Sequence, residues 1–442
     1  MRFWLILLVT LFLILGGGAY WFSEVDLVED HQKPTVKLIN PPKGIGVQAR
    51  EFQVQLSDQG AGLDRVTVNL KQRGYSKELY RQALAGIKET EFSLSIAADQ
   101  SYLVEGEASI EIKVLDRSLV GNPIVEILPI QIDFKAPKLK IVTSQHNLQL
   151  GGSQLAFYEL KERALFESGI QVENLRFIGY PARKFDLSLD APELYAVLYT
   201  VPAGSTEKPV LFAEDLAGNI VTTSFYNLVL KRKFGTLKVS SNREAFIKTL
   251  SPEAATEASQ LEETVQAERN KAALIIAESS GKFSSERLWK GSFSKPLGSV
   301  RTAFGAQLKF YNKSETILSY AESGYVFSGP LADSNVYAPN TGKIVFSGEL
   351  PFYGKSLVID HGFGLSTMLG NLSTLASQVG ERVLVGQMVG ERSPAGILGN
   401  GTIFIEMRLQ GVPVEPREWW DAEWVKQHID NKVKEVKGNY GL

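Results

Sequence analysis

The chain has 442 residues, 44% of them hydrophobic and 22% charged, which is typical of a globular protein with about two to four domains. Its 47 lysines and arginines balance 49 acids, so the net charge of −2 lacks the basic surplus of a nucleic-acid binder. The absence of cysteine excludes disulfides, thiolate nucleophiles and cysteine-ligated metals. A zinc site would have only four histidines to draw on, namely His31, His146, His361 and His428.

An uncharged apolar segment runs from Phe3 to Phe22 and is long enough to cross a membrane as a helix. Arg2 precedes it and acids beginning with Glu24 follow it, so the positive-inside rule leaves the amino terminus in the cytoplasm. We predict a single-pass anchor of the cytoplasmic (inner) membrane over residues 1–25, with the bulk of the chain in the periplasm or outside the cell. A cleaved signal peptide ending near Gly16 to Ala19 is the alternative.

Two consecutive segments, residues 33–135 and 136–232, consist of short β-type runs separated by turn residues. Residues 52–56, 66–70 and 110–114 alternate apolar and polar side chains, which is the pattern of half-buried strands. We therefore predict a β-sandwich in each segment.

The two segments share similar sequence motifs at corresponding positions. Similar tetrapeptides open them at Pro34 and Pro137, and near their ends Asp116 and Asp215 each precede a Gly-Asn pair. Such a pair supplies the positive φ angles of a tight turn, and the aspartate can accept hydrogen bonds from turn amides. We favour this turn chemistry over calcium or ligand binding. The pair resembles bacterial immunoglobulin-like modules, which implies a spacer or a contact surface.

Residues 250–280 are predicted to form an acidic amphipathic helix. Ser251 and Pro252 are typical of a helix start. Four apolar residues then recur on one helical face: Leu261, Val265, Ala272 and Ile276. The simpler interpretation is a helix that lies on a neighbouring domain, and the alternative is a regulatory or partner-binding arm.

From Leu288 onward, the sequence consists of β-type segments separated by glycines. They include Val336 to Pro339, Leu357 to Gly362 and Ile405 to Arg408. In order and spacing, residues 288–420 resemble the LytM or lysostaphin-like metallopeptidases, family twenty-three, which cut peptidoglycan. The resemblance implies an antiparallel β-sheet that forms a substrate groove. Residues 421–442 are left as a carboxy-terminal tail.

The resembled family binds zinc through a His-x-x-x-Asp pair and the last histidine of a His-x-His pair. Aligned on this sequence, the first pair falls at Ser323 and Phe327, and the second at Thr402 and Phe404. A further catalytic histidine corresponds to Asn371. Because catalytic zinc needs three protein ligands, we expect no metal, no cofactor and no catalytic residue here.

Three polar residues are predicted to line the groove that remains: His361, Asn371 and Arg408. His361 lies in a His-Gly-x-Gly turn and, as a lone histidine, is interpreted as structural. Phe327 and Phe404 are expected to convert a metal pocket into an apolar one.

The chain is therefore predicted to be a mainly β, membrane-anchored pseudopeptidase. It would bind a cell-wall amidase or other hydrolase, or peptidoglycan, and regulate cell-wall remodelling, with no nucleic-acid partner. The alternatives are an active zinc-dependent peptidoglycan endopeptidase with an atypical site, and a purely structural envelope protein.

Overall fold

The computed structural model describes residues 32–118, 122–240, 258–280, 283–312, 315–330, 333–395 and 398–442. The predicted anchor over residues 1–25 lies outside these ranges, and no helix within them is both long and apolar enough to cross a membrane. The described chain is mainly β, with mostly antiparallel sheets. It divides into two compact units. The amino-terminal unit ends at Pro137 but also takes Glu162–Phe166 and Glu214–Val221, and the carboxy-terminal unit contains the other residues up to Leu442.

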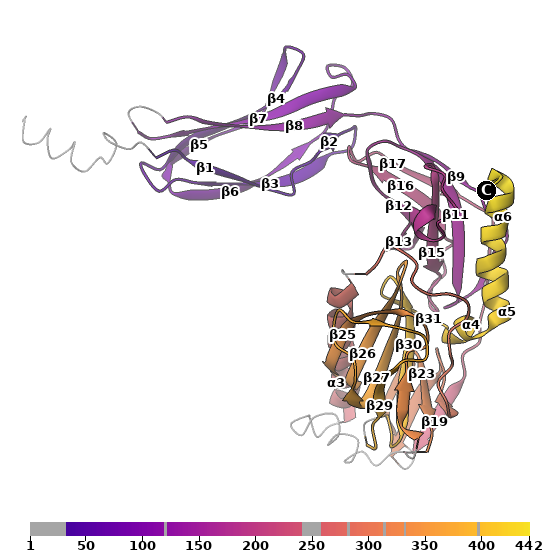
Figure 1. The fold of residues 1–442 in the computed structure, drawn as a ribbon. Helices are drawn as coiled ribbons and strands as arrows, with labels where there is room; N and C mark the ends of the chain where they lie inside the picture. The colour runs from indigo at the N-terminus through magenta and orange to yellow at the C-terminus, as the bar shows by residue number, and fades with distance from the viewer. Residues whose placement is uncertain are drawn as a thin grey trace, which may run out of the picture. The chain divides into compact units, whose positions relative to one another are not determined.

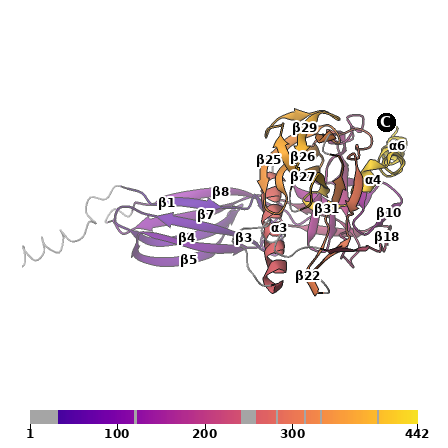
Figure 2. The ribbon, with the colours of Figure 1, turned by 90° about the horizontal axis from the view of Figure 1, so that it is seen from below.

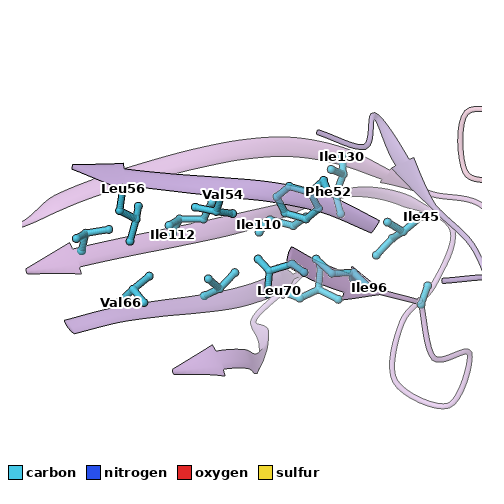
Figure 3. Close-up of a cluster of buried hydrophobic side chains, with 14 of the residues drawn as sticks. Ile45, Phe52, Val54, Leu56, Val66, Leu70, Ile96, Ile110, Ile112 and Ile130 are labelled. Atoms are coloured by element: carbon cyan, nitrogen blue, oxygen red, sulfur yellow. The ribbon is translucent and has the colours of Figure 1, made fainter. Parts of the chain in front are cut away.

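The amino-terminal unit is a sandwich of two sheets (Figure 1). One sheet has the order β1(Thr35–Ile39), β3(Arg50–Ser57), β6(Glu89–Ile96), and the other β2(Gly44–Ile45), β8(Ile124–Ile132), β7(Gly106–Asp116), β4(Leu63–Gln72), β5(Tyr75–Ile87). The predicted alternation is confirmed, because Phe52, Val54 and Leu56 of β3 all point into the core between the sheets (Figure 3). Each such side chain contributes about 1.5–3 kcal/mol by burial.

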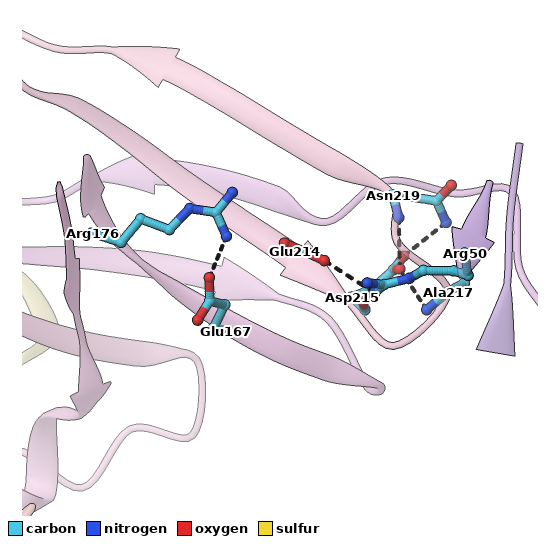
Figure 4. Close-up of polar contacts among 7 residues, drawn as sticks. All are labelled: Arg50, Glu167, Arg176, Glu214, Asp215, Ala217 and Asn219. Atoms are coloured by element: carbon cyan, nitrogen blue, oxygen red, sulfur yellow. Dashed lines mark hydrogen bonds and ion pairs between the residues drawn. The ribbon is translucent and has the colours of Figure 1, made fainter. Parts of the chain in front are cut away.

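The aspartates that precede the Gly-Asn pairs are engaged in turn chemistry. Asp215 Oδ1 accepts hydrogen bonds from the backbone amides of Ala217 (2.8 Å) and Asn219 (2.9 Å), and Oδ2 accepts one from the Asn219 side chain (2.8 Å) (Figure 4). Asp116 likewise accepts a hydrogen bond from Asn122 Nδ2 at 2.9 Å. These carboxylates are used to close their own turns, as the turn interpretation predicts.

A second pair of sheets follows. One has the order β14(Tyr180–Pro181), β15(Leu194–Thr200), β11(Ser153–Lys161), β9(Lys138–Ile141), and the other β13(Leu175–Ile178), β12(Leu165–Val172), β16(Val210–Asp215), β17(Ile220–Ser224). The short helix η1(Ala182–Lys184) and the parallel pair β10(His146–Gln149) and β18(Asn227–Leu230) complete this module. Within this module, the longest runs of buried side chains are in β11 and β15.

The last and largest sheet contains the segment that resembles the metallopeptidases. Its path is β20(Ser299–Thr302), β23(Tyr325–Ser328), β30(Thr402–Leu409), β27(Leu365–Leu375), β26(Gly354–Gly362), β25(Gly342–Leu350), β28(Arg382–Val383). The strands β24(Asn335–Tyr337), β29(Met388–Arg392) and β31(Val412–Val414) branch from this path. A separate small sheet has the order β19(Thr236–Ser240), β21(Gln307–Asn312), β22(Glu315–Ala321).

The helix α3(Ala258–Ser280) packs on β22 and β25 and lies beside β25 in both views (Figures 1 and 2). The predicted start at Ser251 and Pro252 falls outside the described residues. The predicted apolar face is confirmed, since its four members are at most 2% exposed: Leu261, Val265, Ala272 and Ile276. They pack against strand residues such as Phe404 and Val326. The helix therefore lies on its neighbouring domain.

The segment predicted as a tail is helical and packs on the second sandwich. It forms α5(Ala422–Val425), the π-helical turn η3(Lys426–Asp430) and α6(Asn431–Tyr440), directly after α4(Pro416–Trp420), and α6 contacts β11 (Figure 1). Trp419 Nε1 donates to Ser153 Oγ at 3.0 Å, and Lys432 Nζ donates to the Ser144 carbonyl at 2.7 Å. The last residues therefore join the large sheet to the second sandwich.

Trp419→Ala should lower the free energy of unfolding of the carboxy-terminal unit by about 3–5 kcal/mol, because the indole is fully buried. Urea unfolding followed by tryptophan fluorescence suits this test, since every tryptophan after residue 31 lies in this unit. Trp424→Ala, which removes a half-buried indole from the same cluster, should cost clearly less. Equal losses for the two variants would contradict a joining role for Trp419.

Candidate functional site

The register between β23 and β30 places the two predicted phenylalanines on opposite faces of the sheet. Val326 lies opposite Phe404, and Phe327 lies opposite Ile403. Because neighbouring side chains of a strand point to opposite faces, Phe404 packs on the α3 side while Phe327 packs in the core on the other side. The expectation that both rings fill one former metal pocket is therefore wrong.

If the family's His-x-x-x-Asp pair is aligned one residue earlier in this sequence, its two positions lie on the same face of the sheet as Phe404. Glu322 and Val326 keep the four-residue spacing of the family's His-x-x-x-Asp pair, and Val326 is the cross-strand neighbour of Phe404. If the three ligands of the family share one face, their positions would correspond here to Glu322, Val326 and Phe404. Only the strand register reveals this assignment, since counting from the next motif gives Ser323 and Phe327.

Glu322 is the one residue of this set with a ligand-type side chain. It is 2% exposed, and its Oε2 accepts a hydrogen bond from Thr302 Oγ1 at 3.3 Å, while Oε1 has no hydrogen-bond partner among the described residues. Burial raises the pKa of Glu322 to about 7 from its ordinary 4.5, the charge of Arg269 opposes this rise, and Glu406 adds to it. The carboxyl group is thus held near its point of titration at neutral pH.

Helix α3 brings a guanidinium group to the same face. Arg269 Nη2 lies 3.0 Å from the carbonyl oxygen of Ala321 and 3.4 Å from Ser323 Oγ. Its Cζ lies 4.5 Å from the ring centre of Tyr320, a cation–π distance. On the face that would hold a metal ion in the family, this chain therefore has the guanidinium group of Arg269. Unlike a metal ion, a guanidinium group cannot bind a water molecule as a ligand and activate it.

Asn371 and Thr402 form a buried pair. Asn371 Nδ2 donates to Thr402 Oγ1 at 2.8 Å and to the Thr402 carbonyl at 3.0 Å, and the Asn371 amide donates to the Tyr353 carbonyl at 2.7 Å. Asn371 has a φ of 60°, which asparagine tolerates better than most residues. With 5% and 2% exposure, the pair ties β27 to β30 and offers no imidazole for proton transfer.

The other two predicted groove residues are also buried. Arg408 is 8% exposed and forms an ion pair with Glu406, so Asn371 and Arg408 do not line an open groove as predicted. His361 is fully buried between the Thr341 carbonyl and Thr367 Oγ1, each 2.9 Å away. Burial lowers the pKa of His361 to about 4, so the ring is neutral and braces its turn.

These residues do not fit the zinc ion that the family resemblance implies. Valine and phenylalanine cannot ligate zinc, and Glu322 alone supplies one of the three ligands required. Within the part of the chain that the structure describes, no three histidines, aspartates or glutamates are grouped so as to hold a metal ion.

Glu322→Gln should flatten the pH dependence of stability. The folded protein binds the Glu322 proton more tightly than the unfolded chain does, so wild-type stability falls as the pH rises from about 4.5 to about 7, by up to about 3 kcal/mol. Urea unfolding at pH 5 and pH 8 measures this loss. Between these two pH values, the free energy of unfolding of the variant should fall by about that much less than the free energy of unfolding of wild type. Glu262→Gln, which changes an exposed acid of α3, should behave like wild type. Parallel pH profiles for wild type and Glu322→Gln would contradict the assignment.

Comparison with known proteins identifies relatives of this segment. Residues 321–416 match the sequence profile of peptidase family M23. The murein hydrolase activator EnvC of Escherichia coli (strain K12) is 33% identical over 92 residues, which is 21% of this chain and 22% of EnvC. An uncharacterized protein of Haemophilus influenzae is 25% identical over 91 residues, 21% of this chain and 22% of that protein. This chain thus covers about a fifth of the length of these relatives.

Among solved structures, a peptidase M23 from Pseudomonas aeruginosa superimposes with a TM-score of 0.39 at 16% sequence identity. The match covers 62% of this chain and 94% of the other.

Proposed function

Residues 321–416 form a peptidase M23 domain of the LytM type, and from this premise we propose that the chain regulates cell-wall hydrolysis without itself cutting peptidoglycan. Its partner is a cell-wall amidase or other hydrolase, or peptidoglycan. The similarity of this segment to a murein hydrolase activator supports regulation. Fold alone is a weak guide to activity, so the chemistry of the site must carry the proposal.

The observation that carries the proposal is the composition of the α3-facing side of the sheet. Val326 and Phe404 stand at two ligand positions, and Arg269 faces the carboxyl group at the third. The positions of the two basic histidines hold Asn371 and Thr402, whose side chains are bonded to one another. These groups cannot hold a Lewis acid, and neither Asn371 nor Thr402 can replace a histidine as general base.

The rest of the chain supports a place in the cell envelope. The apolar segment from Phe3 to Phe22 serves as a single-pass anchor in the cytoplasmic membrane, and the remainder lies in the periplasm or outside the cell. The two sandwiches are immunoglobulin-like modules that act as spacers or contact surfaces. The Asp116 and Asp215 turns are internally bonded, which favours a structural role for both loops.

A chelator should leave the protein unchanged. Incubation with EDTA should not shift the melting temperature, because no closed zinc site can be built from the described residues. With added zinc and purified sacculi, the protein should release no more soluble fragments than a boiled control. Fragment release that EDTA abolishes would favour the active endopeptidase with an atypical site.

Weakening α3 should increase partner binding, since a partner that binds the sheet face covered by α3 must first replace the helix. Val265 is 1% exposed in this contact, so Val265→Asp should loosen α3 and raise sacculus co-sedimentation or hydrolase activation severalfold. The matched control is Leu274→Asp on the same helix, where the side chain is 65% exposed. It should behave like wild type. Weaker binding by Val265→Asp would show that α3 itself belongs to the binding surface.

A further inference from the structure

A cavity of about 260 Å³ lies on the side of the large sheet that faces away from α3. Its inner wall is apolar, and the side chains of Leu369, Ile403 and Ile405 that form it are each 1% exposed. Lys295 and Tyr337 stand at its exposed rim. The strand register that turns Phe404 toward α3 turns Ile403 and Ile405 toward this cavity.

Arg392, the last residue of β29, also lines this cavity and is 4% exposed. Its Nη2 donates to the Leu297 carbonyl at 2.7 Å, but Nε and Nη1 have no hydrogen-bond partner in the structure. No aspartate or glutamate is among the described residues that line the cavity. A buried charge with unsatisfied donors is costly, so a group that pairs with it from outside would be bound favourably.

The backbone around Arg392 leaves space for its guanidinium group. A Cβ atom at Gly329 would lie 2.0 Å from Arg392 Nη1, so any larger residue there would displace the guanidinium. Gly329 does not have the positive φ that requires glycine elsewhere in this sheet. Lys295 adds a second positive charge at the rim, where its Nζ lies 5.5 Å from the Phe327 ring centre. Space and charge are thus both arranged for an anion.

We propose that this cavity binds the carboxylate end of a peptide whose last residue is small and apolar. The carboxylate would accept hydrogen bonds from Arg392, with Lys295 adding charge at the rim, and the apolar side chain would rest on Leu369, Ile403 and Ile405. The cavity is at the small end of ligand sites, which suits one residue and excludes a large ligand. Its apolar wall favours a carboxylate on an apolar body over a fully hydrated anion such as phosphate. The site is separate from the sheet face that α3 covers and does not depend on the function proposed above.

The test is a calorimetric or NMR titration of the full chain with N-acetylalanine, its neutral methylamide and inorganic phosphate. N-acetylalanine should bind, and the methylamide, which lacks the charge, should bind at least about tenfold more weakly. Phosphate should also bind more weakly than N-acetylalanine. Binding of the methylamide or of phosphate as tight as that of N-acetylalanine would overturn the proposal.

Two variants connect that binding to this cavity. Arg392→Met should weaken N-acetylalanine binding at least about tenfold, and Lys295→Met about two- to fivefold. Arg392→Met should keep at least the wild-type melting temperature, because it removes an unpaired buried charge. If Arg392→Met fails to fold, the binding of N-acetylalanine by Lys295→Met, which changes an exposed residue, tests the proposal. Arg382→Met, an exposed arginine outside the cavity, is the matched control and should bind like wild type. Unchanged binding by both cavity variants would overturn the proposal.

Discussion

The pairing of β23 with β30 is the constraint on which the rest of the site depends. Because Val326 lies opposite Phe404, one face of the sheet carries Glu322, Val326 and Phe404 toward α3. The other face carries Phe327 and Ile403 into a separate core. A strand cannot slip by one residue without moving every side chain to the opposite face of the sheet, so this register is held by both cores at once. The two faces can therefore serve different purposes.

Buried charges are treated differently on the two faces. On the α3 side, Arg269 and Glu322 are close enough for the guanidinium to oppose the desolvation that raises the pKa of the carboxyl group. On the other side, Arg392 has no such partner among the residues that the structure describes. A buried cation with an acidic neighbour needs no external partner, whereas a buried cation without one is stabilised when an external anion binds. This difference in charge compensation separates the α3-facing residues from the cavity that is proposed to bind a ligand.

The carboxy-terminal helices and the end of β30 connect the large sheet to the second sandwich. Trp419 reaches Ser153 of the second sandwich, and Gln410, just after β30, exchanges two 2.8 Å hydrogen bonds with the backbone of Ile178. Both contacts join residues more than 200 positions apart in the chain, as do the contacts of Lys432. Most of the second sandwich is therefore part of the same compact unit as the M23 domain, with a shared interface in addition to the chain connection.

The sequence by itself determined the strand patterns around Phe52 and Val66, the apolar face of α3 and the turns at Asp116 and Asp215, because all of these rest on local periodicity or on bonds between near neighbours. It also determined the resemblance of residues 288–420 and the lack of histidines at the expected zinc positions. Only the tertiary structure decided that Phe327 and Phe404 face apart and that Asn371 and Arg408 are buried. It alone brought Arg269 to Glu322 and left Arg392 unpaired, because register and long-range packing involve residues far apart in the chain, which no local pattern can relate.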